Sequence, residues 1–461
     1  MAKLLSVSPQ YPLDVVVEFD EADEAAVEMV MARARTAQAV WSEMPVLARS
    51  AALVEIADAI SMAATEITDL GVREVGKARG EMAGEIARGI SILRYYAQSM
   101  LDPDGEMLPV SNKNGLLFTR RRPYGVVGVV TPWNFPVAIP LWKAAPALAY
   151  GNAVVCKPSP FATAIALRLE EIFSLFLPPG CFSVVPGGLL TGQAVVNAVD
   201  GLSFTGSATA GQAVVLAAAV RKIPVQAEMG GQNPSIVLPD APFEQVAEII
   251  AHAAMDYAGQ KCTATSRVIV LGDPRPFTDA LVAAVKTLVV GDPADPHVVV
   301  RPVISHKAQQ MVTDAIDEAR AGGGQILVGG TSIQGHGYFV DPTLIAGLDP
   351  RHRLAQEEVF GPFATVLTAR DADEAIRIAN DVRYGLVGSV FTGDLDRALS
   401  FVDRLNVGMV RVNAPTTGVD FYAPFGGVKD SSIGPREQGK AARDFYTWTQ
   451  TVTISPARES V

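Results

Sequence analysis

From residue 124 onward, short apolar runs of strand character alternate with helical stretches, and this alternation limits the fold more than any other feature. The first such runs are GVVGVV, AVVCK, CFSVV, GLSFT and VQAEM, separated by helical patterns at 161–176, 191–199 and 208–220. A second set begins near residue 233 with NPSIVL, SRVIVL, ATVLT, LVGSVFT and VGMVRV, separated by helical patterns at 243–257, 276–289, 307–320 and 372–380. Such alternation favours parallel sheets covered by helices. We therefore expect an α/β protein with two open parallel-sheet lobes.

The remaining segments predict helices at the N-terminal side and paired strands elsewhere. Apolar residues recur at helical spacing over 24–48, 50–70 and 81–100, and Gly71 is expected to end the second of these helices. Residues 106–123 predict a hairpin around an Asn-Gly turn. The tail DFYTWTQTVTI alternates like a strand and lacks a covering helix, so we expect it to pair with another strand, including one from a second subunit.

Composition and motif absences exclude several classes of function. The chain has 38 Lys and Arg against 49 Asp and Glu, a net charge of −11, and no basic run longer than 120–122, which argues against nucleic acid. Three cysteines form no disulfide framework and fit a reducing compartment. No apolar stretch is long enough to span a membrane, no signal peptide precedes the first strand, and no HExxH or CxxC spacing indicates a metal. We expect a cytoplasmic protein without metal or membrane contact.

Two groups of strand-end residues are candidates for ligand binding. TPWNFP (131–136) follows an apolar strand, and its prolines restrict the backbone around Trp133 and Asn134. KPSP (157–160) and FTGSATAG (204–211) also follow strands, where open α/β sheets bind ligands, and the glycines there let a phosphate approach helix N–H groups. Each pattern by itself also fits an ordinary turn.

Two further islands carry a carboxylate and a thiol. EMGGQNP (228–234) places Glu228 before a Gly-Gly turn, and GQKC (259–262) ends in Cys262. A thiol with a pKa of about 8.5 must be shifted toward thiolate before it attacks efficiently, and a helix N-terminus, a cationic cofactor ring or Lys261 would favour this. Taken singly, Cys262 fits an inert thiol, as we expect for Cys156 and Cys181, and Glu228 fits a capping carboxylate.

Taken together, these islands resemble the aldehyde dehydrogenase superfamily. TPWNFP, VCKPS, FTGS, EMGGQNP, GQKC, EEVFGP (357–362) and PFGG-K (424–429) follow one another in the superfamily's order. Asn134 and Lys157 lie 23 positions apart, and Glu228 and Cys262 lie 34 apart, as in the superfamily pattern. The resemblance covers about residues 20–455.

The resemblance implies a catalytic cysteine mechanism. Cys262 would attack the aldehyde carbon as thiolate, and Asn134 together with the Cys262 backbone N–H would stabilise the oxyanion. After hydride transfer, Glu228 would act as general base for hydrolysis of the thioester. Glu437 in PREQG is a second carboxylate that could share this role.

The resemblance also implies a dinucleotide site, NAD or NADP. Lys157 would contact the adenosine ribose, Gly206 and Ser207 the diphosphate, Glu358 the nicotinamide ribose and Phe360 the ring. The full set of expected cofactor residues is Thr131, Pro132, Trp133, Lys157, Ser159, Gly206, Ser207, Gly230, Glu358 and Phe360. Many NAD-specific relatives carry glutamate where this chain has Pro160; without that carboxylate a 2′-phosphate is tolerated, so we expect NADP use at least equal to NAD.

For the substrate, GQKCTATSRVIV and PTTGVDFYAPFGGVKDSSIGPREQG are most similar to the α-ketoglutarate semialdehyde (2,5-dioxopentanoate) dehydrogenase group. The arginines that hold succinate semialdehyde in its dehydrogenases are replaced by Trp142 and Asp256, which makes that substrate less favoured. Trp142, Tyr257 and Tyr422, with Phe421, would instead form a tunnel for an aromatic or long apolar aldehyde, or are ordinary packing residues. The same residues also allow a cofactor-free thiol esterase, or a non-catalytic relative that kept the fold.

The resemblance finally implies an aldehyde dehydrogenase fold with three parts. Residues 1–105 and 124–229 would form the cofactor-binding domain, and 230–440 the catalytic domain. Residues 106–123 and 441–461 would form a β-hairpin oligomerisation flap, giving a homodimer or homotetramer.

Overall fold

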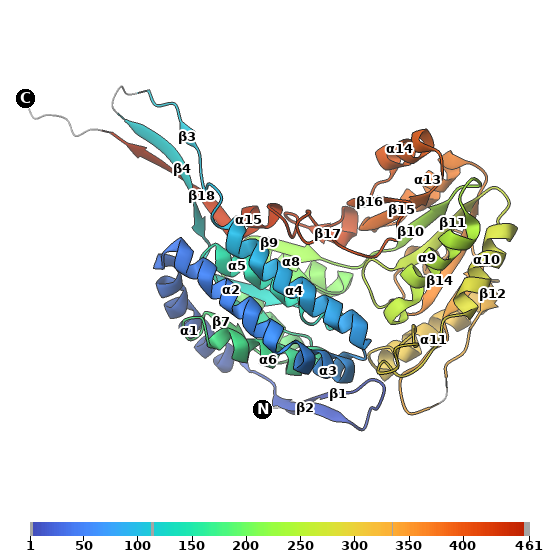
Figure 1. The fold of residues 1–461 in the computed structure, drawn as a ribbon, viewed down its shortest axis with the longest axis horizontal. Helices are drawn as coiled ribbons and strands as arrows, with labels where there is room; N and C mark the ends of the chain where they lie inside the picture. The colour runs from blue at the N-terminus through green and yellow to red at the C-terminus, as the bar shows by residue number, and fades with distance from the viewer. Residues whose placement is uncertain (1–2, 112–114, 334, 456–461) are drawn as a thin grey trace, which may run out of the picture.

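The computed structural model describes residues 3–111, 115–333 and 335–455, and shows two α/β lobes with a protruding β-arm (Figure 1). The first lobe is built on a six-stranded sheet in the order β17-β9-β8-β5-β6-β7. Its strands are β5 (Val126–Val130), β6 (Ala153–Lys157), β7 (Phe182–Val184), β8 (Gly201–Thr205), β9 (Val225–Glu228) and β17 (Ser432–Ile433). All neighbours are parallel except β17, which is antiparallel to β9. The predicted parallel sheet is confirmed for this lobe.

The helices of the first lobe follow from this strand order. They are α1 (Glu24–Glu43), α2 (Val46–Met62), α3 (Ala64–Val75), α4 (Arg79–Ser99), α5 (Ala138–Ala149), η1 (Pro160–Ala162), α6 (Thr163–Ser174), α7 (Leu189–Ala198) and α8 (Ala208–Arg221). Since parallel crossovers are right-handed, the path β5-β6-β7 places α5 and α6 on one face, and the return to β8 and β9 places α7 and α8 on the other. A separate hairpin, β1 (Lys3–Val7) with β2 (Val15–Asp20), lies at the edge of this lobe (Figure 1).

The second lobe is built on a seven-stranded sheet in the order β12-β13-β14-β11-β10-β15-β16. Its strands are β10 (Asn233–Val237), β11 (Thr265–Leu271), β12 (Gln325–Val328), β13 (Thr343–Ala346), β14 (Phe363–Ala369), β15 (Val387–Phe391) and β16 (Met409–Val412). Only the β12–β13 pair is antiparallel. Its helices are α9 (Phe243–Met255), η2 (Asp256–Gly259), α10 (Arg275–Lys286), α11 (His306–Ala321), α12 (Arg353–Gln356), α13 (Ala372–Asn380) and α14 (Leu395–Arg404). The second predicted lobe is therefore also present.

The arm is a three-stranded antiparallel sheet. It contains β3 (Met107–Leu108), β4 (Leu116–Pro123) and β18 (Thr447–Ile454), in the order β18-β4-β3. The register of β4 with β18 runs from the pair Pro123 and Thr447 to the pair Leu116 and Ile454. The predicted hairpin and tail strand thus pair with one another within one chain. The Asn-Gly turn expected between β3 and β4 includes residue 114, outside the described residues, as are positions 1–2 and 456–461 of the expected domains.

Two segments belong to the first lobe, although the expected boundaries assign them to the catalytic domain and to the flap. Strand β17, preceded by η3 (Lys429–Ser431), falls within 230–440 but pairs with β9 of the first sheet. Helix α15 (Ala441–Tyr446) falls within the expected flap, yet Phe445 and Tyr446 are buried in the hydrophobic core of the first lobe. Both segments join the first lobe after the chain has returned to it from the second lobe. The pairing of β17 with β9 and the burial of α15 therefore place the domain boundaries at different residues from those expected.

Gly71 does not end a helix, contrary to expectation. It lies inside α3, and a Cβ atom there would lie 2.5 Å from Sδ of Met82 on α4, so the glycine permits close helix packing. The helix ends instead at Gly76, whose φ of 64° is left-handed.

Membrane spans and metal clusters are both absent from the described residues. No helix there is both long and apolar enough to cross a membrane. No group of three or more His, Cys, Asp or Glu side chains in these segments is arranged to hold a metal ion.

Candidate active site

The candidate nucleophile lies in the loop that joins η2 to β11, at the amino end of the second sheet. Tyr257, Ala258 and Gly259 before it have φ values of 54°, 53° and 65°, all left-handed. Non-glycine residues are costly in this region and persist where surrounding contacts hold them. A Cβ at Gly259 would lie 2.2 Å from the carbonyl oxygen of Gly361, so this turn packs directly against the EEVFGP loop. The turn therefore fixes the path of the chain into half-buried Cys262.

Asn134 joins this loop to the first lobe. It follows β5 at the carboxyl edge of the first sheet and is 3% exposed. Its Nδ2 donates a hydrogen bond of 2.9 Å to the carbonyl oxygen of Gln260, two residues before Cys262. An amide nitrogen has two hydrogens, so one is left for a developing oxyanion beside the thiol. This hydrogen bond brings together two sequence islands more than a hundred residues apart.

A buried ion pair that sequence analysis missed supports Asn134. Lys77 Nζ lies 2.5 Å from Oε2 of Glu85 and donates 2.8 Å to the backbone oxygen of Asn134. Glu85 Oε1 accepts from the backbone N–H groups of Val137 and Ala138, at 2.8 and 2.9 Å. The ion pair of Lys77 and Glu85 thus binds the backbone of the Asn134 loop at two places, the carbonyl oxygen of Asn134 and the N–H groups that begin α5. The only sequence signal was a lysine directly after the helix-ending Gly76, and that gives no hint of a partner eight residues later.

Glu228 ends β9 and is 2% exposed. Burial and the charge of Glu437 raise the pKa of Glu228 well above its usual value, while Ser432, Lys143 and Arg436 act in the opposite direction. Glu437, the second candidate base, forms a buried ion pair with Lys143, whose Nζ also donates 2.9 Å to Ser203 Oγ. Glu437 is therefore engaged by a cation through Oε1, while Oε1 of Glu228 and Oε2 of Glu437 each lack a hydrogen-bond partner among the described residues.

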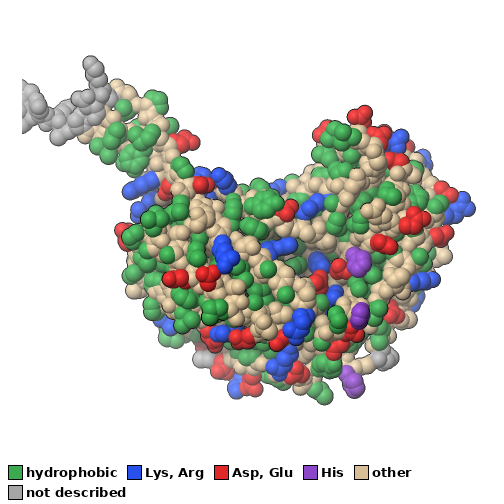
Figure 2. All heavy atoms as spheres, in the orientation of Figure 1, with side chains coloured by type: hydrophobic (Ala, Val, Ile, Leu, Met, Phe, Trp, Pro, Cys, Tyr) green, Lys and Arg blue, Asp and Glu red, His purple; other side chains and the backbone are tan. Residues whose placement is uncertain are grey.

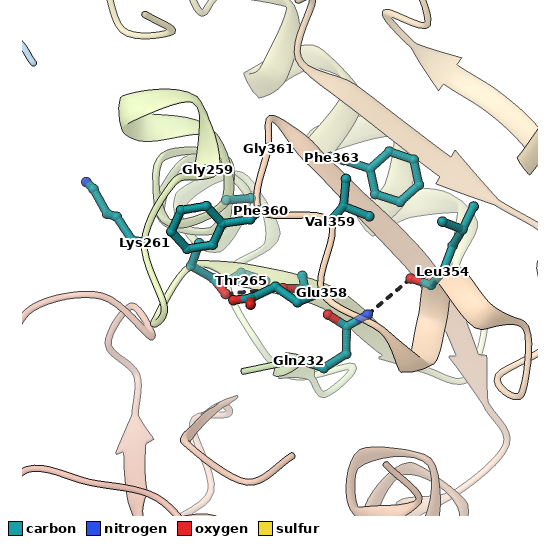
Figure 3. Close-up of a pocket in the computed structure, with 13 residues that line it drawn as sticks. Gln232, Gly259, Lys261, Thr265, Leu354, Glu358, Val359, Phe360, Gly361 and Phe363 are labelled. Carbon is teal, nitrogen blue, oxygen red and sulfur yellow. Dashed lines mark hydrogen bonds between the residues drawn. The ribbon is translucent and has the colours of Figure 1, made fainter. Parts of the chain in front are cut away.

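The electrostatic surroundings of the thiol keep it protonated. Desolvation and the charges of Glu358, Glu228 and Glu437 raise the pKa of Cys262, and its own backbone N–H opposes them. Lys261, which the sequence offered as an activator, instead lies 2.9 Å from Glu81, and Figure 3 shows its side chain pointing away from Glu358. Burial also raises the pKa values of Cys156 and Cys181 to about 12, in keeping with the inert thiols expected there.

The strand order of the first sheet locates a ligand crevice. The chain moves from β5 to β6 and β7, then returns to β8 on the other side of β5, so the order reverses between β5 and β8. Open α/β sheets bind ligands at such a point, outside the carboxyl ends of the strands. Thr131, Lys157 and Gly206 follow or end the strands β5, β6 and β8 at this edge. Pro132 and Trp133 continue the Thr131 loop. The expected phosphate-side residues are therefore brought together.

Polar groups at this edge are present without protein partners. Lys157 is buried, burial lowers its pKa to about 8, and no ion pair among the described residues includes it. The hydroxyl of Thr205 is also buried and lacks a hydrogen-bond partner within the described segments. Ser207 caps α8, and Ser159 caps η1. A buried cation and a buried hydroxyl beside a helix N-terminus fit an anionic ligand such as a diphosphate.

A pocket at the EEVFGP loop is lined by residues that include Gly259, Lys261, Glu358 and Phe360 (Figure 3). A Cβ at Gly230 would lie 2.0 Å from Oε2 of Glu358, so a larger residue there would displace this carboxylate. The N–H of Gly231 donates 3.3 Å to Glu358 Oε1, and burial raises the pKa of Glu358 to about 8. Phe360, with a left-handed φ of 54°, contacts Trp133 edge-on at 5.9 Å between ring centroids. The carboxylate of Glu358 and the ring of Phe360 therefore line the same pocket as Gly259 and Lys261 of the thiol loop.

The model of the aldehyde dehydrogenase family matches residues 2–452. The chain belongs to this family. It is 40% identical to an alpha-ketoglutaric semialdehyde dehydrogenase of Bacillus subtilis over 455 residues, 96% of this chain and 93% of the relative. It is 38% identical to an alpha-ketoglutarate semialdehyde dehydrogenase of Haloferax volcanii, over 96% of this chain and 94% of the relative. A betaine aldehyde dehydrogenase from Staphylococcus aureus, solved with NAD⁺, matches with a TM-score of 0.94 and 30% identity, covering 98% of this chain and 91% of that one. The expected fold is confirmed, and the protein is an NAD(P)-dependent aldehyde dehydrogenase.

In this aldehyde dehydrogenase, the three expected substrate-lining aromatics differ in burial and contacts. Tyr257 is fully buried and its hydroxyl donates 2.8 Å to the carbonyl oxygen of Val75. Trp142 is 6% exposed and packs on Phe425 at 5.6 Å between centroids. Tyr422 is 61% exposed. Trp142 and Tyr257 thus pack against other residues of the chain, and their role toward the substrate stays a prediction.

Proposed function

We propose that this enzyme oxidises a small semialdehyde, 2,5-dioxopentanoate, to its carboxylic acid through a covalent intermediate on Cys262. The observation that carries the proposal is the hydrogen bond from Asn134 Nδ2 to the carbonyl oxygen of Gln260, which sets a side-chain amide beside the thiol loop. The 40% and 38% identical relatives, both named for this semialdehyde, support the substrate. The burial of Trp142 and Tyr257 fits their interpretation as packing residues, and an aromatic or long apolar aldehyde is the alternative substrate.

In the first half-reaction, the Cys262 thiol loses its proton to solvent, the thiolate Sγ forms a bond to the aldehyde carbon, and the electron pair of the carbonyl double bond moves onto the oxygen. Asn134 Nδ2 and the Cys262 backbone N–H donate to this oxyanion, and loss of one such donor costs about 10²- to 10³-fold in rate. When bound, the dinucleotide supplies a nicotinamide ring that accepts the hydride. The residues that would hold it are Lys157, Gly206 and Ser207 at the phosphate side, with Glu358, Phe360 and Trp133 at the ring side.

In the second half-reaction, Glu228 takes a proton from water, the hydroxide adds to the thioester carbon, and the Cys262 thiolate leaves. A base with a raised pKa is matched to proton transfer near neutral pH. Because Glu437 is paired with Lys143, we assign this role to Glu228 alone.

Purified enzyme should be assayed with 2,5-dioxopentanoate, succinate semialdehyde and benzaldehyde, each with NAD and with NADP. We expect kcat/KM to be highest for 2,5-dioxopentanoate. A higher kcat/KM for benzaldehyde would overturn the substrate and favour the aromatic tunnel. Ester hydrolysis without any cofactor reduction would favour the thiol esterase instead.

We also propose that the arm of β3, β4 and β18 joins subunits into a homodimer or homotetramer. Strand β18 is an edge strand with open hydrogen-bonding groups, and such edges pair readily with other strands. Figure 2 shows hydrophobic side chains gathered on this arm, where Met107, Leu116 and Ile454 are 69%, 50% and 49% exposed. Light scattering should give a dimer or tetramer, and a monomer at micromolar concentration would contradict this role.

A further inference from the structure

Strand β17 is a two-residue strand that adds to the edge of the first sheet directly beside Glu228. Its antiparallel register places Ser432 opposite Glu228 and Ile433 opposite Ala227. Directly paired residues of antiparallel strands have their side chains close together. The short strand therefore brings one hydroxyl group to the proposed general base from a segment about two hundred residues away.

The hydrogen bonds around Ser432 have a defined direction. Ser432 Oγ lies 2.5 Å from Oε2 of Glu228, and the backbone N–H of Gly427 donates to the same Oγ at 2.6 Å. Because an ionised carboxylate oxygen can only accept, the hydrogen of this contact comes from the Ser432 hydroxyl. Ser432 therefore donates to Glu228.

The second carboxylate oxygen is in a different situation. Oε1 of Glu228 is buried and has no hydrogen-bond partner in the described part of the chain. A Cβ at Gly426 would lie 2.8 Å from this oxygen and 2.9 Å from Cδ of Arg436, so a larger residue there would crowd both side chains. One oxygen is thus fixed by a hydroxyl, and the other has no hydrogen-bond partner among the described residues.

We propose that Ser432 is a positioning residue for deacylation, fixing Oε2 of Glu228 so that Oε1 takes the proton of the attacking water. This proposal rests on the proposed function, because it needs Glu228 to act as the base. Ser432 holds the rotamer of the carboxylate and stabilises its charged form, since a hydroxyl that donates to a carboxylate favours the ionised state.

The charges that face Glu228 determine the direction of the expected pH effect. Glu437 and burial raise the pKa of Glu228, and the Ser432 hydroxyl, Lys143 and Arg436 lower it. The charge of Glu228 also raises the pKa of the Cys262 thiol, so these two groups face one another electrostatically. Lys143 is paired with Glu437. Ser432, in contrast, donates a hydrogen bond directly to Glu228. Removing its hydroxyl should raise the pKa of Glu228 and move the acid limb of hydrolysis to higher pH.

The test compares Ser432→Ala and Ser432→Thr with the wild-type enzyme, using stopped-flow bursts of cofactor reduction and steady-state kcat as a function of pH. We expect Ser432→Ala to keep the burst, to lose about tenfold in kcat at neutral pH, and to recover at alkaline pH, since one pKa unit corresponds to a tenfold change in the ionised fraction below the pKa. Ser432→Thr should retain the wild-type pH profile. Ser91→Ala is the matched control, because its hydroxyl bonds only within its own helix, to Ala87.

Each outcome separates this proposal from the proposed function. An unchanged pH profile in Ser432→Ala, with Glu228→Gln still stalled after the burst, would overturn the role of Ser432 alone. Normal turnover by Glu228→Gln would overturn the assignment of the base. Loss of the burst in a folded Ser432→Ala protein would indicate a structural role and also overturn the proposal. If the alanine variant does not fold, Ser432→Cys, a similarly shaped side chain with a weak donor, gives the same comparison.

Discussion

Lys77 Nζ lies 2.8 Å from the backbone oxygen of Asn134, and the same ammonium group is paired with Glu85 in the interior of the protein. The ammonium also sits 3.6 Å from the centre of the Phe135 ring. The amide that is expected to stabilise the oxyanion is therefore held through its own backbone by a buried cation. Oxyanion stabilisation depends on donors that are in place before the reaction begins, so this ion pair connects the stability of the fold to the rate of acylation.

Breaking this pair should be strongly destabilising. Lys77→Met leaves the Glu85 carboxylate buried without its cation, and such changes cost about 3–5 kcal/mol. The double variant Lys77→Met with Glu85→Gln should lose less than the sum of the single changes, because no uncompensated charge remains. Denaturant unfolding measures both. As a control, Arg94→Ala breaks an exposed pair with Asp58 and should cost about 1 kcal/mol or less. Additive losses at Lys77 and Glu85 would contradict the coupling.

The Cys262 thiol should react slowly with alkylating reagents in the enzyme without cofactor. Desolvation and the nearby carboxylates raise its pKa, so the thiolate fraction at neutral pH is small and should rise about tenfold per pH unit below the pKa. Glu358→Gln removes a nearby charge and should speed alkylation. The gain should appear mainly above pH about 8, where the wild-type Glu358 carboxyl is ionised. The rate of iodoacetamide labelling measures this, and Cys262→Ser should remove the labelling. A plateau in rate at neutral pH would show that the thiol is already ionised.

The two sheets were predictable because their strands and most of their helices carry a clear periodic signal. The helix expected at 372–380 coincides with α13, whose buried residues recur at helical spacing. Helix α5 was not predicted, because every residue from Ala138 to Ala149 is buried and Pro146 lies inside it. A helix that is apolar on all sides gives no amphipathic signal. Gly71 was misinterpreted for a related reason, since sequence alone does not distinguish a glycine that ends a helix from one that admits a neighbouring side chain.

At the candidate active site, the sequence motifs contain the proposed reacting groups but not the residues that hold them. Cys262, Glu228 and Asn134 lie within short, rigid motifs with a superfamily-wide order. Lys143 and Glu437 are separated by almost three hundred residues, and their pairing exists only after the tail has returned to the first lobe. Such contacts depend on tertiary structure and leave no local pattern.

Glu228→Gln should separate the two halves of the reaction. The amide cannot take a proton from water, so acylation should proceed and give a burst of cofactor reduction without steady turnover. The burst amplitude should approach one per active site in a stopped-flow experiment. Cys262→Ser should give no burst while still binding the cofactor, which fluorescence titration with the reduced cofactor can check. Normal turnover of Glu228→Gln would move the base to Glu437, despite its ion pair with Lys143.

Cofactor preference should depend on pH through Lys157. Burial lowers the pKa of Lys157 to about 8, so in the free enzyme its positive charge is present at lower pH and is lost as the pH rises through about 8. With Pro160 following in place of an acidic residue, we expect NADP to be used at least as well as NAD at neutral pH, where the ammonium can pair with a 2′-phosphate. Above pH 8 the KM for NADP should rise more steeply than the KM for NAD. Lys157→Ala should raise the KM for NADP at neutral pH and remove this difference in pH dependence. Steady-state kinetics across this pH range measure the KM for NADP and for NAD in the wild-type enzyme and in Lys157→Ala. A hundredfold preference of the wild-type enzyme for NAD at neutral pH would refute the expected use of NADP.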